Sequence, residues 1–129
     1  MGTPTSSDTY LKVRDMSRAV RFYEAFLGVE SKTRYEDRWA SITGHLGFYG
    51  PGYDLEHGVP MTEYDREVQV GNNVMLAFGT DGIERERDRV KSLDATGVTD
   101  VVEVNLMAPY RLFQFQDPEG HVIEVGKFG

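Results

Sequence analysis

Apolar and polar residues alternate along several short segments of the 129-residue chain, and two longer segments between them have a helical period instead. Alternation indicates strands with one buried face, whereas apolar residues every three to four positions indicate a helix with one buried stripe. The pattern predicts strands over 9–13, 29–36, 38–42, 46–50, 73–79, 98–106, 110–116 and 121–125, and helices over 16–28 and 81–97.

Capping residues precede both predicted helices. Asp15 or Ser17 can accept an orphan backbone N–H at the start of the first helix. Asp81 is the expected N-cap of the second helix, and Glu84, three residues later, completes the signature of a capping box.

The order strand, helix, three strands occurs twice along the chain. Leu11 and Leu76 hold equivalent places in the two opening strands, and Gly28 and Gly97 are expected to end the two helices. The offset is about half the chain, which indicates an internal duplication. The prediction is therefore an α+β fold of two βαβββ modules, each a four-stranded sheet with one outer helix.

The expected organisation is a single domain over residues 8–129 after a disordered N-terminus at 1–7. The N-terminal residues have neither a basic start nor an apolar core, so they do not read as a secretory signal. Module one covers 8–50 and module two covers 71–129. Residues 51–70 are rich in glycine, proline and acidic side chains, and are predicted to be a long loop.

Composition excludes several classes of function. The net charge is −7 with no block of Lys or Arg, which argues against nucleic acid as the main partner. No apolar run approaches the length of a membrane span. The chain has no cysteine, which excludes disulfides and cysteine nucleophiles and is consistent with a cytoplasmic location. No serine-hydrolase spacing, phosphate-binding loop or zinc-helix motif occurs.

One carboxylate, Glu124, lies inside an apolar run near the C-terminus. The preceding residues 117–120 (Asp-Pro-Glu-Gly) fit a type I turn and predict a hairpin. A regular hairpin places Phe113 opposite Glu124 and Phe115 opposite Val122, whereas a bulge at the turn would shift this register.

Burial of an isolated charge is costly, so Glu124 needs a partner. Three kinds of partner are open: a metal, a cationic ligand, or a fixed donor such as Arg111 or Lys12. An internal ion pair between Glu124 and Arg111, without any chemistry, is the simplest alternative.

The segments 19–28 (AVRFYEAFLG), 13–15 (Val-Arg-Asp) and 115–125 (FQDPEGHVIEV) resemble the vicinal oxygen chelate superfamily. This superfamily contains glyoxalase I, bleomycin-resistance proteins and extradiol dioxygenases. The resemblance implies curved mixed sheets that form a cup for a small molecule. It also implies one divalent metal in the enzymes and a homodimer.

The metal-using relatives take their ligands from the first and last strands of each module. Glu124 matches the family carboxylate, but Asn73 stands where a histidine is expected. Asp8, or Tyr10 if the register slips, stands at the other histidine position. The last strand of module one offers only Phe48 or Tyr49. One match in four is poor for a metal site.

The prediction for function is therefore metal-independent binding of a small aromatic or cationic molecule. The alternative is a glyoxalase-type lyase or isomerase, or a dioxygenase, in which Glu124 is the catalytic base and a ligand to nickel, zinc, manganese or iron. Asp8, His57 or a residue of a partner chain would complete that metal site. A third reading is a structural dimer domain whose cup is filled by its own side chains.

The predicted ligand-binding residues are aromatic, polar or charged side chains on the strands that would line the cup. They are Tyr10, Lys12, Trp39, Phe48, Asn73, Met75, Arg111, Phe113, Phe115 and Glu124.

Overall fold

A computed structural model describes residues 2–4 and 6–129 and divides the chain into two compact units. The first unit extends to Gln69 and the second begins at Val70. Within the predicted disordered terminus, residues 1 and 5 lie outside the described residues. No helix among the described residues is both long enough and apolar enough to cross a membrane.

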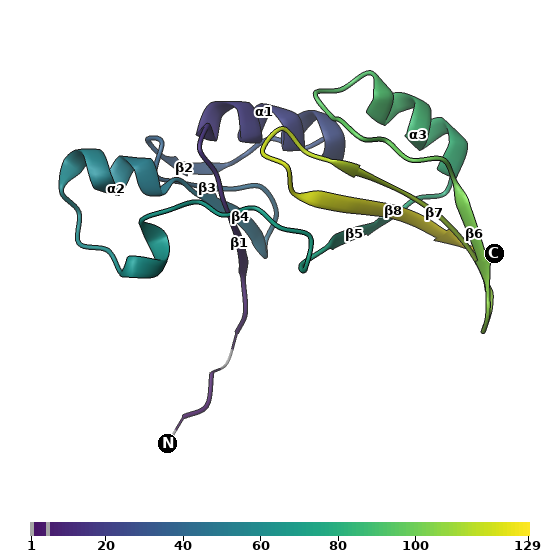
Figure 1. The fold of residues 1–129 in the computed structure, drawn as a ribbon, viewed down its shortest axis with the longest axis horizontal. Coiled ribbons are helices and arrows are strands. Elements are labelled where there is room, and N and C mark those ends of the chain that lie inside the picture. The colour runs from purple at the N-terminus through teal and green to yellow at the C-terminus, as the bar shows by residue number, and fades with distance from the viewer. Residues whose placement is uncertain (1, 5) are drawn as a thin grey trace. The chain divides into compact units, whose positions relative to one another are not determined.

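The first unit contains a four-stranded mixed sheet with one helix along it (Figure 1). The sheet order is β1-β4-β3-β2, with β1 parallel to β4 and the other neighbours antiparallel. The elements are β1 (Thr9–Lys12), α1 (Met16–Leu27), β2 (Thr33–Tyr35), β3 (Trp39–Ser41) and β4 (Leu46–Tyr49), followed by α2 (Pro51–His57) and the short 3₁₀ helix η1 (Glu63–Asp65).

The second unit repeats this arrangement with sheet order β5-β8-β7-β6 and a parallel β5–β8 pair. Its elements are β5 (Leu76–Gly79), α3 (Ile83–Lys91), β6 (Val102–Asn105), β7 (Pro109–Gln116) and β8 (Val122–Phe128). The same strand order in both units confirms the prediction of two βαβββ modules.

The predicted loop over 51–70 is not wholly irregular. Pro51 begins α2, which ends at His57, and η1 follows six residues later. A proline at the first helical position suits a helix start because its missing N–H would have no partner there. The abundance of glycine and acidic residues obscured this short helix in the sequence.

Helix α1 has the caps that the sequence predicts. The carboxylate of Asp15 accepts a hydrogen bond from the Arg18 N–H at 3.1 Å, and Gly28 adopts a left-handed conformation with φ of 67°. The capping box predicted for α3 is wrong, because Gly82 is its N-cap and no side chain caps it. Helix α3 ends at Lys91, so Gly97 lies beyond it.

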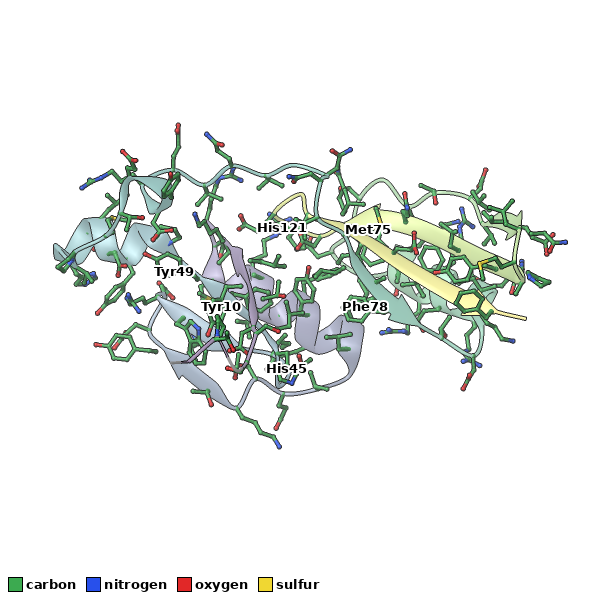
Figure 2. The ribbon with its side chains drawn as sticks, turned by 90° about the horizontal axis from the view of Figure 1, so that it is seen from below. Tyr10, His45, Tyr49, Met75, Phe78 and His121 are labelled. Carbon is green, nitrogen blue, oxygen red and sulfur yellow. The ribbon has the colours of Figure 1, made fainter. Side chains whose placement is uncertain are left out.

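Each unit buries one face of its sheet. In the first unit the Phe48 ring lies 5.0 Å from the ring of Tyr23 on α1. In the second unit the corresponding strand residues pack on the side of α3. The fully buried members of this core are Ile83, Val90, Phe113, Phe115, Ile123 and Val125. We call the face opposite to α1 or α3 the open face of each sheet (Figure 2). In the first unit, α2 and η1 contact the open face through Tyr49 and Lys12.

Candidate functional site

Glu124 lies on the open face of the second sheet. It pairs with Gln114 on β7 and with Ala77 on β5, and residues paired in register point to the same face. The predicted register is wrong by one residue, since Phe113 pairs with Val125 and Phe115 with Ile123. Both phenylalanines therefore belong to the core and not to the surroundings of Glu124.

The hairpin loop explains the shift of register. The Asp117 N–H donates to the His121 carbonyl at 2.9 Å, so these two residues close the loop around three residues rather than two. Oδ1 of Asp117 accepts the N–H groups of Glu119, Gly120 and His121, each at 2.9 Å. Gly120 has a φ of 102°, which L side chains rarely adopt, and this conformation accommodates the extra residue. The loop therefore takes the bulged alternative.

Two neutral donors hold the carboxylate of Glu124. The Tyr110 hydroxyl donates to Oε2 at 2.9 Å, and the side-chain amide of Gln114 donates to Oε1 at 3.0 Å. The same amide lies 3.5 Å from the sulfur of Met75. Burial, and then the bond to Glu124, raise the pKa of Tyr110 above its usual value, so the phenol stays a donor. Sequence reasoning missed both Tyr110 and Gln114.

Arg111 lies on the opposite face of β7 from Glu124. It forms an ion pair with Glu84 on α3. This bond raises the pKa of Arg111 and lowers the pKa of Glu84. Arg111 is therefore neither the fixed donor to Glu124 nor a residue of the open face, and both predicted roles, as partner and as ligand-binding residue, are wrong. Alternation along β7 is the reason, because Arg111 shares a face with Phe113.

The Tyr110 ring lies across Gly126 on the neighbouring strand. A Cβ atom at Gly126 would overlap the Tyr110 phenol, so the ring can reach Glu124 only over a glycine. The ring of Phe128 packs against Tyr110 with centroids 4.6 Å apart. A glycine inside an apolar strand often marks a place where another group comes close to the backbone. Gly126 was therefore the signal in the sequence that a side chain such as Tyr110 lies across β8.

The open face of the first sheet carries Tyr10 and Tyr49 (Figure 2), and the strand register adds Lys12 and Trp39. Gly47 shares this face. Phe48 points to the opposite side and is completely buried in the core, so its predicted place on the ligand side is wrong.

Lys12 is bound to a segment of its own unit. Its ammonium donates to the Tyr64 carbonyl at 2.8 Å and lies 3.0 Å from Oδ1 of Asp65. The alternative in which Lys12 is the fixed donor to Glu124 is therefore wrong. Arg14 donates to the Val68 carbonyl at 3.1 Å and ties the same segment down.

Asp54 on α2 is a buried carboxylate with two strong partners. Arg38 donates to it at 2.7 and 3.3 Å, and the Tyr49 hydroxyl donates at 2.6 Å. Burial raises the pKa of Asp54, but the bonds from Arg38 and Tyr49 outweigh burial and bring the pKa below its usual value. Burial and the bond to Asp54 raise the pKa of Tyr49 to about 12. The cluster ties α2 to the first sheet.

A family model described as the Glyoxalase/Bleomycin resistance protein/Dioxygenase superfamily matches residues 8–125. The chain belongs to this superfamily. The match covers nearly all of both modules and confirms the resemblance seen in the sequence.

Solved structures with the same fold include several members of this superfamily. A glyoxalase/bleomycin resistance protein/dioxygenase family enzyme from Burkholderia phytofirmans PsJN is 17% identical, with a TM-score of 0.72 and coverage of 94% of this chain and 96% of that one. A lactoylglutathione lyase from Agrobacterium tumefaciens is 20% identical, with a TM-score of 0.68 and coverage of 98% and 95%. At these identities the likeness shows the fold alone. No curated protein matches the chain by sequence.

The residues at the superfamily's metal-ligand positions do not fit a divalent metal. Asp8 is exposed beside His45, Asn73 is exposed and neutral, and both oxygens of Glu124 accept bonds from neutral donors. His57 ends α2, where its ring stacks on Tyr53 with centroids 4.0 Å apart. Within residues 2–4 and 6–129, no group of three or more His, Asp or Glu side chains could hold a metal ion. Even a catalytic metal site normally has three protein ligands.

Proposed function

We propose that this superfamily member binds a small aromatic or cationic molecule without a metal, and that Glu124 anchors the ligand. The observation that carries the proposal is the bonding of Glu124. Its two partners, Tyr110 and Gln114, are neutral donors, so neither of them brings a positive charge to the partly buried carboxylate. Within the described residues it forms no ion pair with Lys, Arg or His. A cationic ligand would supply the missing charge.

The surroundings of Glu124 suit a ligand that also has an apolar part. Tyr110 and Phe128 offer aromatic rings on the open face, and Phe128 is largely exposed. Met75 is also exposed and lies within reach of Gln114. Aromatic faces attract organic cations, and flexible methionine side chains adapt to irregular apolar groups.

The test compares benzylamine, which is cationic at neutral pH, with neutral benzyl alcohol on the wild type and on Glu124→Gln. The variant keeps the shape of the side chain and removes its charge. We expect the Kd of benzylamine, measured by calorimetry, to be about tenfold lower for wild type than for Glu124→Gln. The alcohol should bind both proteins equally weakly. Equal amine affinities in the two proteins would rule out Glu124 as the anchor.

A second arm addresses the metal-dependent alternative. Nickel, zinc, manganese and iron(II) salts are added separately to both proteins, and the melting temperature is measured. A ligand that binds only the folded state raises this temperature. We expect no rise with any of the four metals. A rise in wild type that disappears in Glu124→Gln would favour the lyase, isomerase or dioxygenase reading instead.

The homodimer and the cytoplasmic location stay predictions. The first follows from the superfamily resemblance, and the second is consistent with the absence of cysteine.

A further inference from the structure

A second candidate site lies entirely within the first unit, on the open face of its sheet. It is a hollow of about 230 Å³ beside β1, β3 and β4. We call it the Trp39 hollow, and its functional lining consists of Asp8, Tyr10, Trp39, His45 and Gly47. None of these residues contributes to the surroundings of Glu124 described above.

Two aromatic rings at nearly a right angle line the Trp39 hollow. The ring centroids of Tyr10 and Trp39 are 6.2 Å apart, and their planes meet at 77°. Tyr10 is 52% exposed although it sits on a strand, so part of its ring faces solvent rather than core. Aromatic faces carry negative electrostatic potential, and rings set at an angle can surround one cation from two sides.

Gly47 holds the Tyr10 ring in place. A Cβ atom there would lie 2.7 Å from the Ala40 carbonyl oxygen and 3.2 Å from the Tyr10 ring. The ring therefore rests on the backbone of β4, beside Trp39. Any larger residue at this position would push Tyr10 away and change the hollow.

The rim of the hollow carries a carboxylate that has no strong partner. Asp8 lies 3.4 Å from Nδ1 of His45, and its side chain is 45% exposed. Within the described residues Asp8 forms no ion pair with Lys or Arg. One carboxylate and one imidazole are too few donors for a metal, but a carboxylate beside two aromatic rings suits an organic cation.

We propose that the Trp39 hollow binds an organic ammonium ion, of the methylated or quaternary amine class. The methyl groups would contact the ring faces of Tyr10 and Trp39, and Asp8 would balance the charge. A volume of about 230 Å³ suits a compact head group. This site goes beyond the proposed function, because it uses neither Glu124 nor any residue of the second unit.

Trp39 is the only tryptophan of the chain, so tryptophan fluorescence reports directly on the hollow. The full-length protein is titrated with choline and, separately, with 3,3-dimethyl-1-butanol, a neutral molecule of the same shape. We expect a saturable fluorescence change with choline and a Kd at least about fivefold higher for the neutral molecule. Equal affinity for both molecules would overturn the proposal, since the hollow would then recognise shape and not charge.

Variants assign the binding to the named residues. Asp8→Asn and Tyr10→Leu should each raise the choline Kd about fivefold or more. Two control variants remove the same groups elsewhere: Asp100→Asn removes a fully exposed carboxylate, and Tyr64→Leu removes an exposed tyrosine. Both should leave the choline Kd unchanged. Circular dichroism checks that each variant is folded.

Glu124→Gln separates this site from the one proposed above. It should leave the choline titration unchanged even if benzylamine binding is lost. A rise in the choline Kd as large as that in Asp8→Asn would overturn the assignment to the Trp39 hollow. An unchanged Kd in both Asp8→Asn and Tyr10→Leu would overturn it as well.

Discussion

At the scale of single residues, a tyrosine ring lies on a strand glycine in both units. Tyr110 covers Gly126 in the second unit, and Tyr10 covers Gly47 in the first. A glycine weakens a strand by itself, because it has no side chain to pack. Here each glycine leaves the space that an aromatic ring fills, and each ring reaches a candidate ligand site.

The substitution Gly126→Ala tests this packing. The new methyl group would overlap the Tyr110 phenol and force the ring off β8, which breaks its bond to Glu124. We expect a loss of about 1–3 kcal/mol in the free energy of unfolding, the usual range for an overpacked site. Urea denaturation followed by circular dichroism measures the change.

Gly79 provides the matched control, since it is the β5 partner of Gly126 and has open space around its Cβ position. Gly79→Ala should change the free energy of unfolding by less than about 0.5 kcal/mol. In a Tyr110→Ala background the penalty of Gly126→Ala should shrink markedly. A penalty that persists there would show that the tyrosine is not its cause.

The sequence was enough to single out Glu124, but it did not predict the partners of Glu124. A carboxylate inside an apolar strand stands out by chemistry alone. Its partners depend on register, and the register depended on one extra residue in the hairpin loop, which the Asp117–His121 closure and the φ of Gly120 decide. A shift by one residue moves Phe113 and Phe115 from the open face to the core and brings Gln114 beside Glu124.

At the scale of elements, α2 is held to the first sheet by the buried Asp54. The substitution Asp54→Asn leaves the Arg38 guanidinium without its carboxylate. At neutral pH we expect a loss of about 2–4 kcal/mol in the free energy of unfolding. Because the folded-state pKa of Asp54 is lowered, this contribution is present above the ordinary aspartate pKa and is lost as the pH falls through the folded value.

Urea denaturation of wild type and Asp54→Asn at pH 7, 5 and 3 (set to span the aspartate pKa of about 3.9) measures this dependence. The difference between the two proteins should stay constant from pH 7 to 5 and narrow at pH 3. Asp37→Asn is the control, because Asp37 is largely exposed in its pair with Arg34. A difference in the free energy of unfolding that is larger at pH 3 than at pH 7 would contradict the lowered pKa of Asp54.

Residues 58–69, which we call the strap, depend on two cations of the first unit. Lys12 binds the Tyr64 carbonyl and Asp65, and Arg14 binds the Val68 carbonyl. The ion pair is partly exposed, so each contact contributes only about 0–1 kcal/mol. Lys12→Met should therefore loosen the strap without unfolding the unit. Chymotrypsin cleavage after the exposed Tyr64 should become severalfold faster.

The exposed Lys32 offers a control, since Lys32→Met removes the same charge away from the strap. Its cleavage rate should equal that of wild type. A raised salt concentration should speed cleavage of wild type more than that of Lys12→Met, because salt screens the Lys12–Asp65 pair. An unchanged cleavage rate in Lys12→Met would mean that the strap is held by other contacts.

Periodicity predicted the elements better than their ends. Six of the eight strands and both long helices lie within the predicted segments, because alternation and the helical stripe report directly on buried faces. Strand β7 begins one residue before its predicted segment, and β8 continues three residues beyond its own. Helix α2 was missed, since its seven residues are too few to show a clear apolar stripe. The N-cap of α3 was predicted one residue too early, because Asp81 and Glu84 match the capping-box pattern. The helix instead begins after Gly82.

At the scale of the whole molecule, the chain carries 21 acidic and 14 basic side chains. Such an excess attracts cations over a distance set by salt, about 30 Å at 0.01 M and 10 Å at 0.1 M. The choline Kd at the Trp39 hollow should therefore rise about threefold between these salt concentrations, partly through slower association. The affinity for neutral 3,3-dimethyl-1-butanol should not fall, since it has no charge to be attracted. Fluorescence titration at both salt concentrations measures the two Kd values. A choline Kd that does not depend on salt would show that contact with the rings, rather than the negative charge of the protein, governs the affinity.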